Sequence, residues 1–166
     1  MAGHKTSAVH VDKSNAAVLQ GVKGISNGPV AIGVDGISPF PLHISDPSFL
    51  SQVNSLNNAT LPDSGFMAET WSSNMHRTFS VMDEFSIVEG INTATSFPVD
   101  FDKEYNPLAA QLKMVSRLQQ VALQRGVSRD FYSVSYGSWD HHSGVLEPQE
   151  IMFKKVDDAL NAYVAE

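Results

Sequence analysis

The sequence predicts an α/β fold, in which helices cover a β-sheet, and three observations support that prediction. The sequence of residues 106–166 predicts, in order, a helix, a strand, a loop and a second helix, and such alternation of helices and strands is typical of an α/β fold. The apolar run at residues 30–34 indicates a short buried strand. Apolar residues make up 42% of the 166-residue chain and charged residues 17%, a composition typical of soluble globular domains.

The first third of the chain carries few periodic signals. Residues 1–28 are polar and predict a mobile N-terminal region with one short helix near residues 16–19. Residues 38–63 contain four prolines and predict a surface excursion or an insertion. One helix is expected inside this Pro-rich excursion, with Asp46 as its N-cap and Pro47 at its first position.

Residues 64–89 predict a long helix. Aromatic and methionine side chains recur along it at spacings of three to five, which indicates a broad apolar stripe: Phe66, Trp71, Met75, Phe79, Met82 and Phe85. We interpret this stripe as core packing and not as a cofactor site.

The best-defined unit covers residues 106–166. Asn106 is a favourable N-cap, Pro107 suits the first helical position, and Gly126 is expected to end that helix. Residues 130–136 are rich in β-branched and aromatic side chains and predict a buried strand. A loop over residues 137–147 follows, and a second amphipathic helix begins near Pro148. Because the last helix runs to Glu166 without a capping signal, we expect one partial domain, residues 1–166, incomplete at both ends.

The loop after residue 136 is the one segment with clear chemical potential, since ligands in α/β sheets bind beyond the carboxyl ends of strands. Asp140, His141 and His142 offer a carboxylate and two imidazoles within three residues. Such donors suit zinc, manganese or iron, whereas sites built from oxygen alone suit calcium or magnesium. Alternation along an extended loop places Asp140 and His142 on one side and His141 elsewhere, so the loop provides at most half of a four-ligand site. The alternative is a solvated polar loop without a metal.

Composition excludes several classes of function. The net charge of −7 argues against a nucleic-acid partner and against an anionic membrane surface. The chain has no cysteine, which excludes disulfides, thiolate zinc sites and Cys nucleophiles. No apolar run approaches the roughly 18 residues of a membrane span, and the N-terminus does not resemble a signal peptide.

Three motifs resemble the domain-of-unknown-function 1501 family in order and spacing. They are the Gln-Leu pair at residues 111–112, the strand and loop ending in Trp-Asp-His-His at residues 139–142, and the Val-Asp-Asp-Ala-Leu helix motif at residues 156–160. This family is similar to the alkaline-phosphatase and sulfatase superfamily. The resemblance implies a partial alkaline-phosphatase-like three-layer fold with a mostly parallel sheet and a metal site at the carboxyl ends of its strands. The family's Asp-x-His falls on Asp140 and His142, while His141 replaces its Thr and Ser138 its second Gly.

The resemblance implies a fragment of an exported, metal-dependent hydrolase of phosphate or sulfate esters. Asp140 and His142, with His141 as an additional candidate, would bind a divalent metal, and the candidates are zinc, manganese, calcium and magnesium. The partners expected are the remaining part of the same domain and a small-molecule ester, and the isolated chain is expected to be inactive. The alternative is a non-catalytic exported or surface scaffold protein with a structural or lost metal site. A third interpretation is the product of a wrongly bounded gene that does not fold independently.

Overall fold

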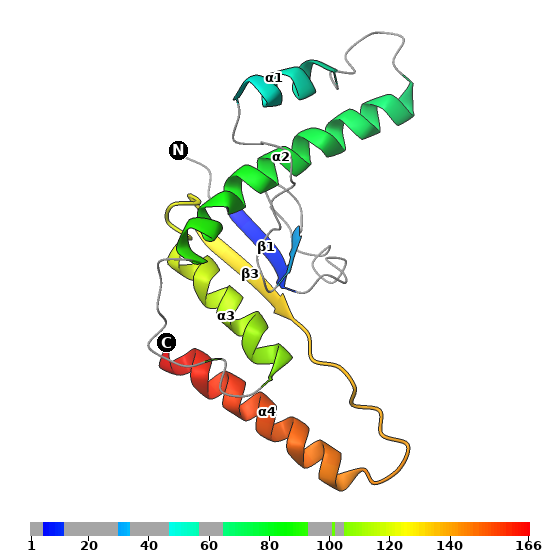
Figure 1. Cartoon of the computed structure of the whole chain (residues 1–166), viewed down its shortest axis with the longest axis vertical. Coiled ribbons are helices and arrows are strands. Elements are labelled where there is room, and N and C mark those ends of the chain that lie inside the picture. Colours follow the sequence, from blue (N-terminus) through cyan, green and yellow to red (C-terminus); the bar gives the residue numbers. More distant parts are fainter. Residues whose placement is uncertain (1–4, 12–29, 34–46, 57–64, 93–100, 102–104) are drawn as a thin grey trace.

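The computed structural model describes residues 5–11, 30–33, 47–56, 65–92, 101 and 105–166 of the chain. Three strands form one sheet in the order β2-β1-β3, and both strand pairs are parallel. The elements in chain order are β1 (Thr6–Val11), β2 (Val30–Ile32), α1 (Pro47–Leu56), α2 (Phe66–Asn92), α3 (Pro107–Gln120), β3 (Arg129–Val134) and α4 (Leu146–Ala165) (Figure 1). The prediction of an α/β fold is confirmed, and its sheet is parallel.

The central strand β1 lies in the segment that the sequence predicted to be polar and mobile, so that prediction is wrong for residues 6–11. Five of its six residues are buried, because β2 and β3 flank it on both edges. Its sequence, Thr-Ser-Ala-Val-His-Val, mixes polar and small residues and therefore lacks the apolar run expected of a central parallel strand. The short helix predicted near residues 16–19 lies outside the described residues.

Helix α3 covers one face of the sheet. The strand register places Val9, Val11, Ile32 and Val134 on this face, and all four belong to one apolar cluster with side chains of α3. The helix contributes Met114, Val115 and Leu118 to that cluster, and Met114 and Leu118 are completely buried. Each fully buried side chain of this size stabilises the fold by about 1.5–3 kcal/mol relative to exposure.

Helix α4 packs on α3, through a second cluster that joins Leu108, Ala109 and Leu112 of α3 to Ala159 of α4. The predicted cap of α3 is confirmed, because the Asn106 side-chain oxygen accepts hydrogen bonds from the amides of Leu108 and Ala109. The same side chain donates to the Lys155 carbonyl at 2.7 Å, which fastens the start of α3 to α4.

Helix α3 ends at Gln120, and residues 121–126 form turns, so the prediction that Gly126 ends the helix is wrong by six residues. Gly126 instead takes a φ of 65°, a left-handed conformation that glycine adopts without strain. The early end of the helix lets the Arg125 side chain fold back toward the Leu118 carbonyl.

The long helix predicted at residues 64–89 is α2, but the interpretation of its whole stripe as core is wrong. Phe66 and Trp71 are 77% and 63% exposed, whereas Met75 and Phe79 are half-buried. The reason is that the first turns of α2 project away from the sheet (Figure 1), and Val81, farther along, packs against the central cluster. Met82 and Phe85 lie among the side chains that the structure does not describe.

Inside the Pro-rich excursion of residues 38–63, the described residues form α1, which begins at Pro47 as predicted. Its expected N-cap, Asp46, lies outside the described residues. None of the helices in the described part of the chain combines the length and the apolar character needed to cross a bilayer.

Candidate functional site

The candidate loop leaves the carboxyl end of β3, and a single buried side chain fixes the point of departure. Gln111 of α3 is 4% exposed, and its amide forms two hydrogen bonds with the backbone of Ser135. Its oxygen accepts from the Ser135 amide at 2.8 Å, and its nitrogen donates to the Ser135 carbonyl at 2.7 Å. The side-chain amide therefore pairs with the backbone of Ser135 as a neighbouring strand would. We name these two hydrogen bonds the Gln111 clamp.

The strand before the loop is more exposed than the sequence predicted. In the described residues β3 pairs only with β1 and forms an edge of the sheet, and Phe131 is 45% exposed. The prediction of a buried strand at residues 130–136 is therefore right in type and wrong in burial. Sequence alone could not show this, because β-branched and aromatic residues suit edge and central strands alike.

Two of the predicted metal ligands lie together in the loop. The Asp140 Oδ2 and His142 Nε2 atoms are 3.4 Å apart, and the two side chains are 86% and 90% exposed. His141 points elsewhere, with its Nε2 atom 3.4 Å from the sulfur of Met152 on α4. This arrangement agrees with the alternation expected along an extended loop.

Aromatic contacts hold the start of the loop against α4. The Tyr136 and Trp139 rings meet edge to face with centroids 5.7 Å apart, and Trp139 lies 5.1 Å from the Phe153 ring. The Trp139 indole also donates a hydrogen bond to the Tyr136 carbonyl at 2.7 Å. Ser138 has a φ of 69°, a conformation that costs a non-glycine residue about 1–2 kcal/mol.

The distance between the two donor atoms of this loop can be compared with that in a metal site. Two donors that each lie about 2.0–2.1 Å from a tetrahedral ion are roughly 3.3 Å apart, close to the separation of the Asp140 and His142 atoms. Within the described ranges, no group of three His, Cys, Asp or Glu side chains is arranged to hold an ion. The described part of the loop therefore provides no more than two donors to an ion, and an incomplete set of ligands binds metal weakly.

The other histidines lie apart from this loop. His10 is buried in the central strand, in register with Ser133, and its Nδ1 atom has no hydrogen-bond partner among the described residues. His76 is on an exposed part of α2. His4 and His43 lie outside the described residues.

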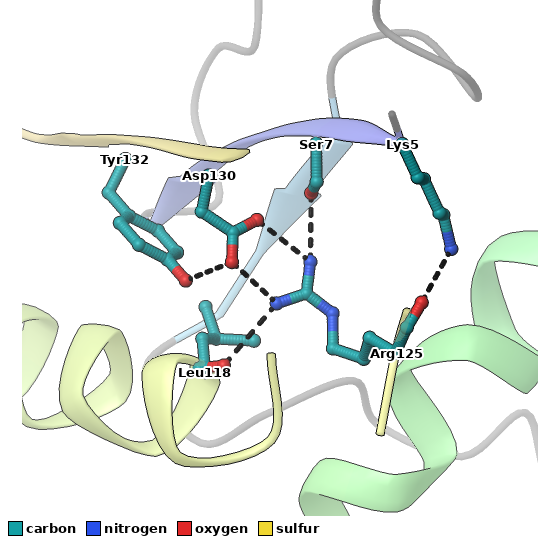
Figure 2. Close-up of polar contacts among 6 residues, drawn as sticks. All are labelled: Lys5, Ser7, Leu118, Arg125, Asp130 and Tyr132. Carbon is teal, nitrogen blue, oxygen red and sulfur yellow. Dashed lines mark hydrogen bonds and ion pairs between the residues drawn. The ribbon is translucent and has the colours of Figure 1, made fainter. Parts of the chain in front are cut away.

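A second polar cluster, which sequence reasoning missed, is buried at the opposite end of β3 (Figure 2). The Arg125 side chain is completely buried and forms an ion pair with Asp130, with one hydrogen bond to each carboxylate oxygen at 3.2 and 3.3 Å. It also donates to the Ser7 hydroxyl at 2.8 Å and to the Leu118 carbonyl at 3.4 Å. We name these residues the Arg125 cluster. It joins β1, β3 and α3 and presents no free donor set to a ligand.

Tyr132 extends the Arg125 cluster by donating its hydroxyl to Asp130 at 2.7 Å. Burial raises the pKa of the Tyr132 hydroxyl well above 10.0, and the hydrogen bond to the Asp130 carboxylate and its negative charge add to that shift. The neutral hydroxyl is thus maintained as a donor.

Comparison of the chain with family models, with curated proteins and with solved structures finds no match. Evidence about function therefore comes from the loop after β3 and from the motif that it carries.

Proposed function

We propose that this chain contributes Asp140 and His142 as two ligands of a divalent-metal site in a hydrolase of phosphate or sulfate esters. The observation that carries the proposal is the 3.4 Å separation of the two donor atoms in the loop after a parallel strand. The motif resembles that of the domain-of-unknown-function 1501 family, which suggests a partial alkaline-phosphatase-like three-layer fold and an exported protein.

The geometry supports a role for each element of the loop. The Gln111 clamp fixes where the loop leaves the sheet, and the Trp139–Phe153 contact holds it against α4. Asp140 supplies a negative oxygen donor and His142 a neutral nitrogen donor, which together suit zinc or manganese, with calcium and magnesium as weaker candidates. A bound divalent metal would supply Lewis-acid activation of an ester oxygen or of a nucleophile.

The site needs further ligands, which we assign to the remaining part of the same domain, together with a small-molecule ester as substrate. For the 166-residue chain by itself we expect weak metal binding and no ester hydrolysis, because affinity depends on a complete set of ligands. A non-catalytic exported scaffold with a lost site is the alternative that the experiment must distinguish.

The test is a titration of the chain with Mn²⁺, followed by paramagnetic broadening of backbone amide signals in NMR spectra. Broadening is expected to centre on residues 137–145 and to disappear in Asp140→Asn and His142→Gln. His141→Gln is the matched control, since this imidazole contacts Met152, and it should preserve most of the broadening.

Broadening that centres elsewhere, or that survives both ligand substitutions, would refute the proposed ligands and favour the scaffold alternative. Hydrolysis of 4-nitrophenyl phosphate or 4-nitrophenyl sulfate is measured in parallel with Mn²⁺ or Zn²⁺ present. Turnover by the chain alone, lost in Asp140→Asn, would contradict the expected inactivity while supporting the ligands.

A further inference from the structure

The loop after β3 has two sides whose donor atoms differ in chemistry. Asp140 and His142 are 86% and 90% exposed and form what we name the outer side of the loop. His141 lies on the other side, where its ring contacts Met152 of α4, and we name this the inner side. The outer side therefore presents its donors in water, whereas the inner side presents an imidazole against a helix.

The contact on the inner side joins two atoms that can both bind a metal. The Nε2 atom of His141 lies 3.4 Å from the Met152 sulfur. Without an ion, this pair can form only a weak N–H···S hydrogen bond, because a thioether is a poor acceptor. A metal about 2.0 Å from an imidazole nitrogen and about 2.3 Å from a sulfur, at a tetrahedral angle, places the two donors roughly 3.5 Å apart. The two atoms are therefore already spaced as ligands of one ion.

The inner side is shielded from water. Met152 is 8% exposed and His141 is half-buried. The Trp139 ring, two residues before His141, lies 5.1 Å from the Phe153 ring and covers the neighbouring part of α4. An apolar shell of this kind limits solvent access to a site, and it favours an ion of low charge because burying charge is costly.

The types of donor select one ion. Imidazole nitrogen is a suitable ligand for copper, and a soft thioether sulfur favours copper in the Cu(I) state. Structural zinc sites are almost always four-coordinate, whereas Cu(I) accepts fewer ligands. The chain has no cysteine, so methionine supplies its only sulfur donors. Hard ions such as Mn²⁺ prefer oxygen donors, which belong to the outer side of the loop.

We propose that His141 and Met152 form a binding site for Cu(I) between the loop and α4. The imidazole binds the ion through Nε2, in the neutral tautomer that carries its proton on Nδ1, and Met152 binds it through the sulfur. The bound ion fastens the loop to α4 at a point next to the contact between Trp139 and Phe153. Because this site uses the inner side of the loop, it does not depend on the divalent-metal site proposed above.

Titration of the full chain with Ag⁺, a redox-stable substitute for Cu(I), tests this site in NMR spectra of the methionine methyl groups. The methyl signal of Met152 should shift first and should saturate at one equivalent. Met67 provides the reference in the same spectra, since its side chain is 79% exposed and is more accessible to a free ion. Anaerobic competition with a coloured Cu(I) chelator then measures the dissociation constant for Cu(I) itself.

Substitutions identify the two ligands. Met152→Leu removes the sulfur and nearly conserves the volume, a change that protein cores tolerate, so the fold should be retained. Met152→Leu and His141→Gln should each raise the Cu(I) dissociation constant by about tenfold or more, because losing a ligand costs at least as much as losing an outer-shell partner. Met67→Leu and His142→Gln are the matched controls, and both should leave the constant unchanged.

Three outcomes would overturn the proposal. The first is a Met67 methyl signal that shifts before that of Met152, and the second is a Cu(I) affinity that survives Met152→Leu. The third is an equal loss of affinity in His142→Gln, because the ion would then be bound on the outer side of the loop. Conversely, a His142→Gln chain that loses Mn²⁺ broadening and keeps its Cu(I) affinity would establish two separate sites.

Discussion

Replacing Arg125 by Met should destabilise the protein severely. Arg125 has no exposed side-chain surface, and it forms hydrogen bonds with Asp130, with the Ser7 hydroxyl and with the Leu118 carbonyl. In Arg125→Met the Asp130 carboxylate, which is 10% exposed, keeps only the Tyr132 hydroxyl as a partner from this cluster. A buried charge that loses its counterion in this way costs about 3–5 kcal/mol.

The magnitude is large in proportion to the whole fold. A single domain has a free energy of unfolding of about 5–15 kcal/mol. A loss of about 3–5 kcal/mol lowers the folding equilibrium constant by roughly two to three and a half powers of ten. Arg125→Met is therefore expected to leave a substantial unfolded fraction under conditions in which the unsubstituted chain is folded.

Urea unfolding followed by far-UV circular dichroism measures this change. Lys154→Met provides the matched control, because Lys154 pairs with Asp158 in an exposed i,i+4 arrangement that is worth no more than about 0.5 kcal/mol. The double variant Arg125→Met/Asp130→Leu should be more stable than Arg125→Met, since it removes the unpaired charge as well. A cost for Arg125→Met as small as that of Lys154→Met would refute the account of the Arg125 cluster as a buried support.

Two further substitutions test the ends of β3. Gln111→Met should cost about 1–3 kcal/mol in urea unfolding, because the Ser135 backbone loses both bonds of the Gln111 clamp. In a Trp71→Phe background, which leaves Trp139 as the one tryptophan, its fluorescence should report a loosened loop. An unchanged unfolding midpoint would exclude the clamp as a support. The free energy of unfolding should fall as pH rises above about 10, because the raised pKa keeps Tyr132 protonated in the folded state while the unfolded state releases its proton. Tyr132→Phe should lack this component in unfolding midpoints measured from pH 8 to 11, and an identical alkaline decline in both proteins would contradict it.

Local signals in the sequence predicted the C-terminal half of the fold well. Asn106 and Pro107 predict a helix start correctly because the cap involves only the next few residues. The alternation that separates Asp140 from His141 also depends only on neighbouring residues. The Gln111 clamp, by contrast, joins residues 24 positions apart, and a buried glutamine gives no sign of its partner in the sequence.

The predictions that were wrong depend on contacts between residues far apart in the sequence. Strand β1 is buried because β2 and β3 flank it. The Ser7 hydroxyl can be buried in this strand because it accepts a hydrogen bond from Arg125, which lies 118 positions away in the sequence. Phe66 and Trp71 show the converse, since an apolar pattern does not reveal that the first turns of α2 pass beyond the sheet. Periodicity describes one element, whereas burial depends on which elements meet.

The position of β1 has a consequence for how the chain folds. Strand β1 pairs over its full length with a strand that begins at residue 129, and the Lys5 carbonyl accepts from the Ser128 amide. During synthesis β1 must therefore wait for more than a hundred further residues before its main ladder can close. Closing so large a loop carries an entropy cost that local helices do not face, so α3 and α4 can form before the sheet does. Until then the edge of β1 that pairs with β3 stays open, and this interval is when the nascent chain is most exposed to aggregation.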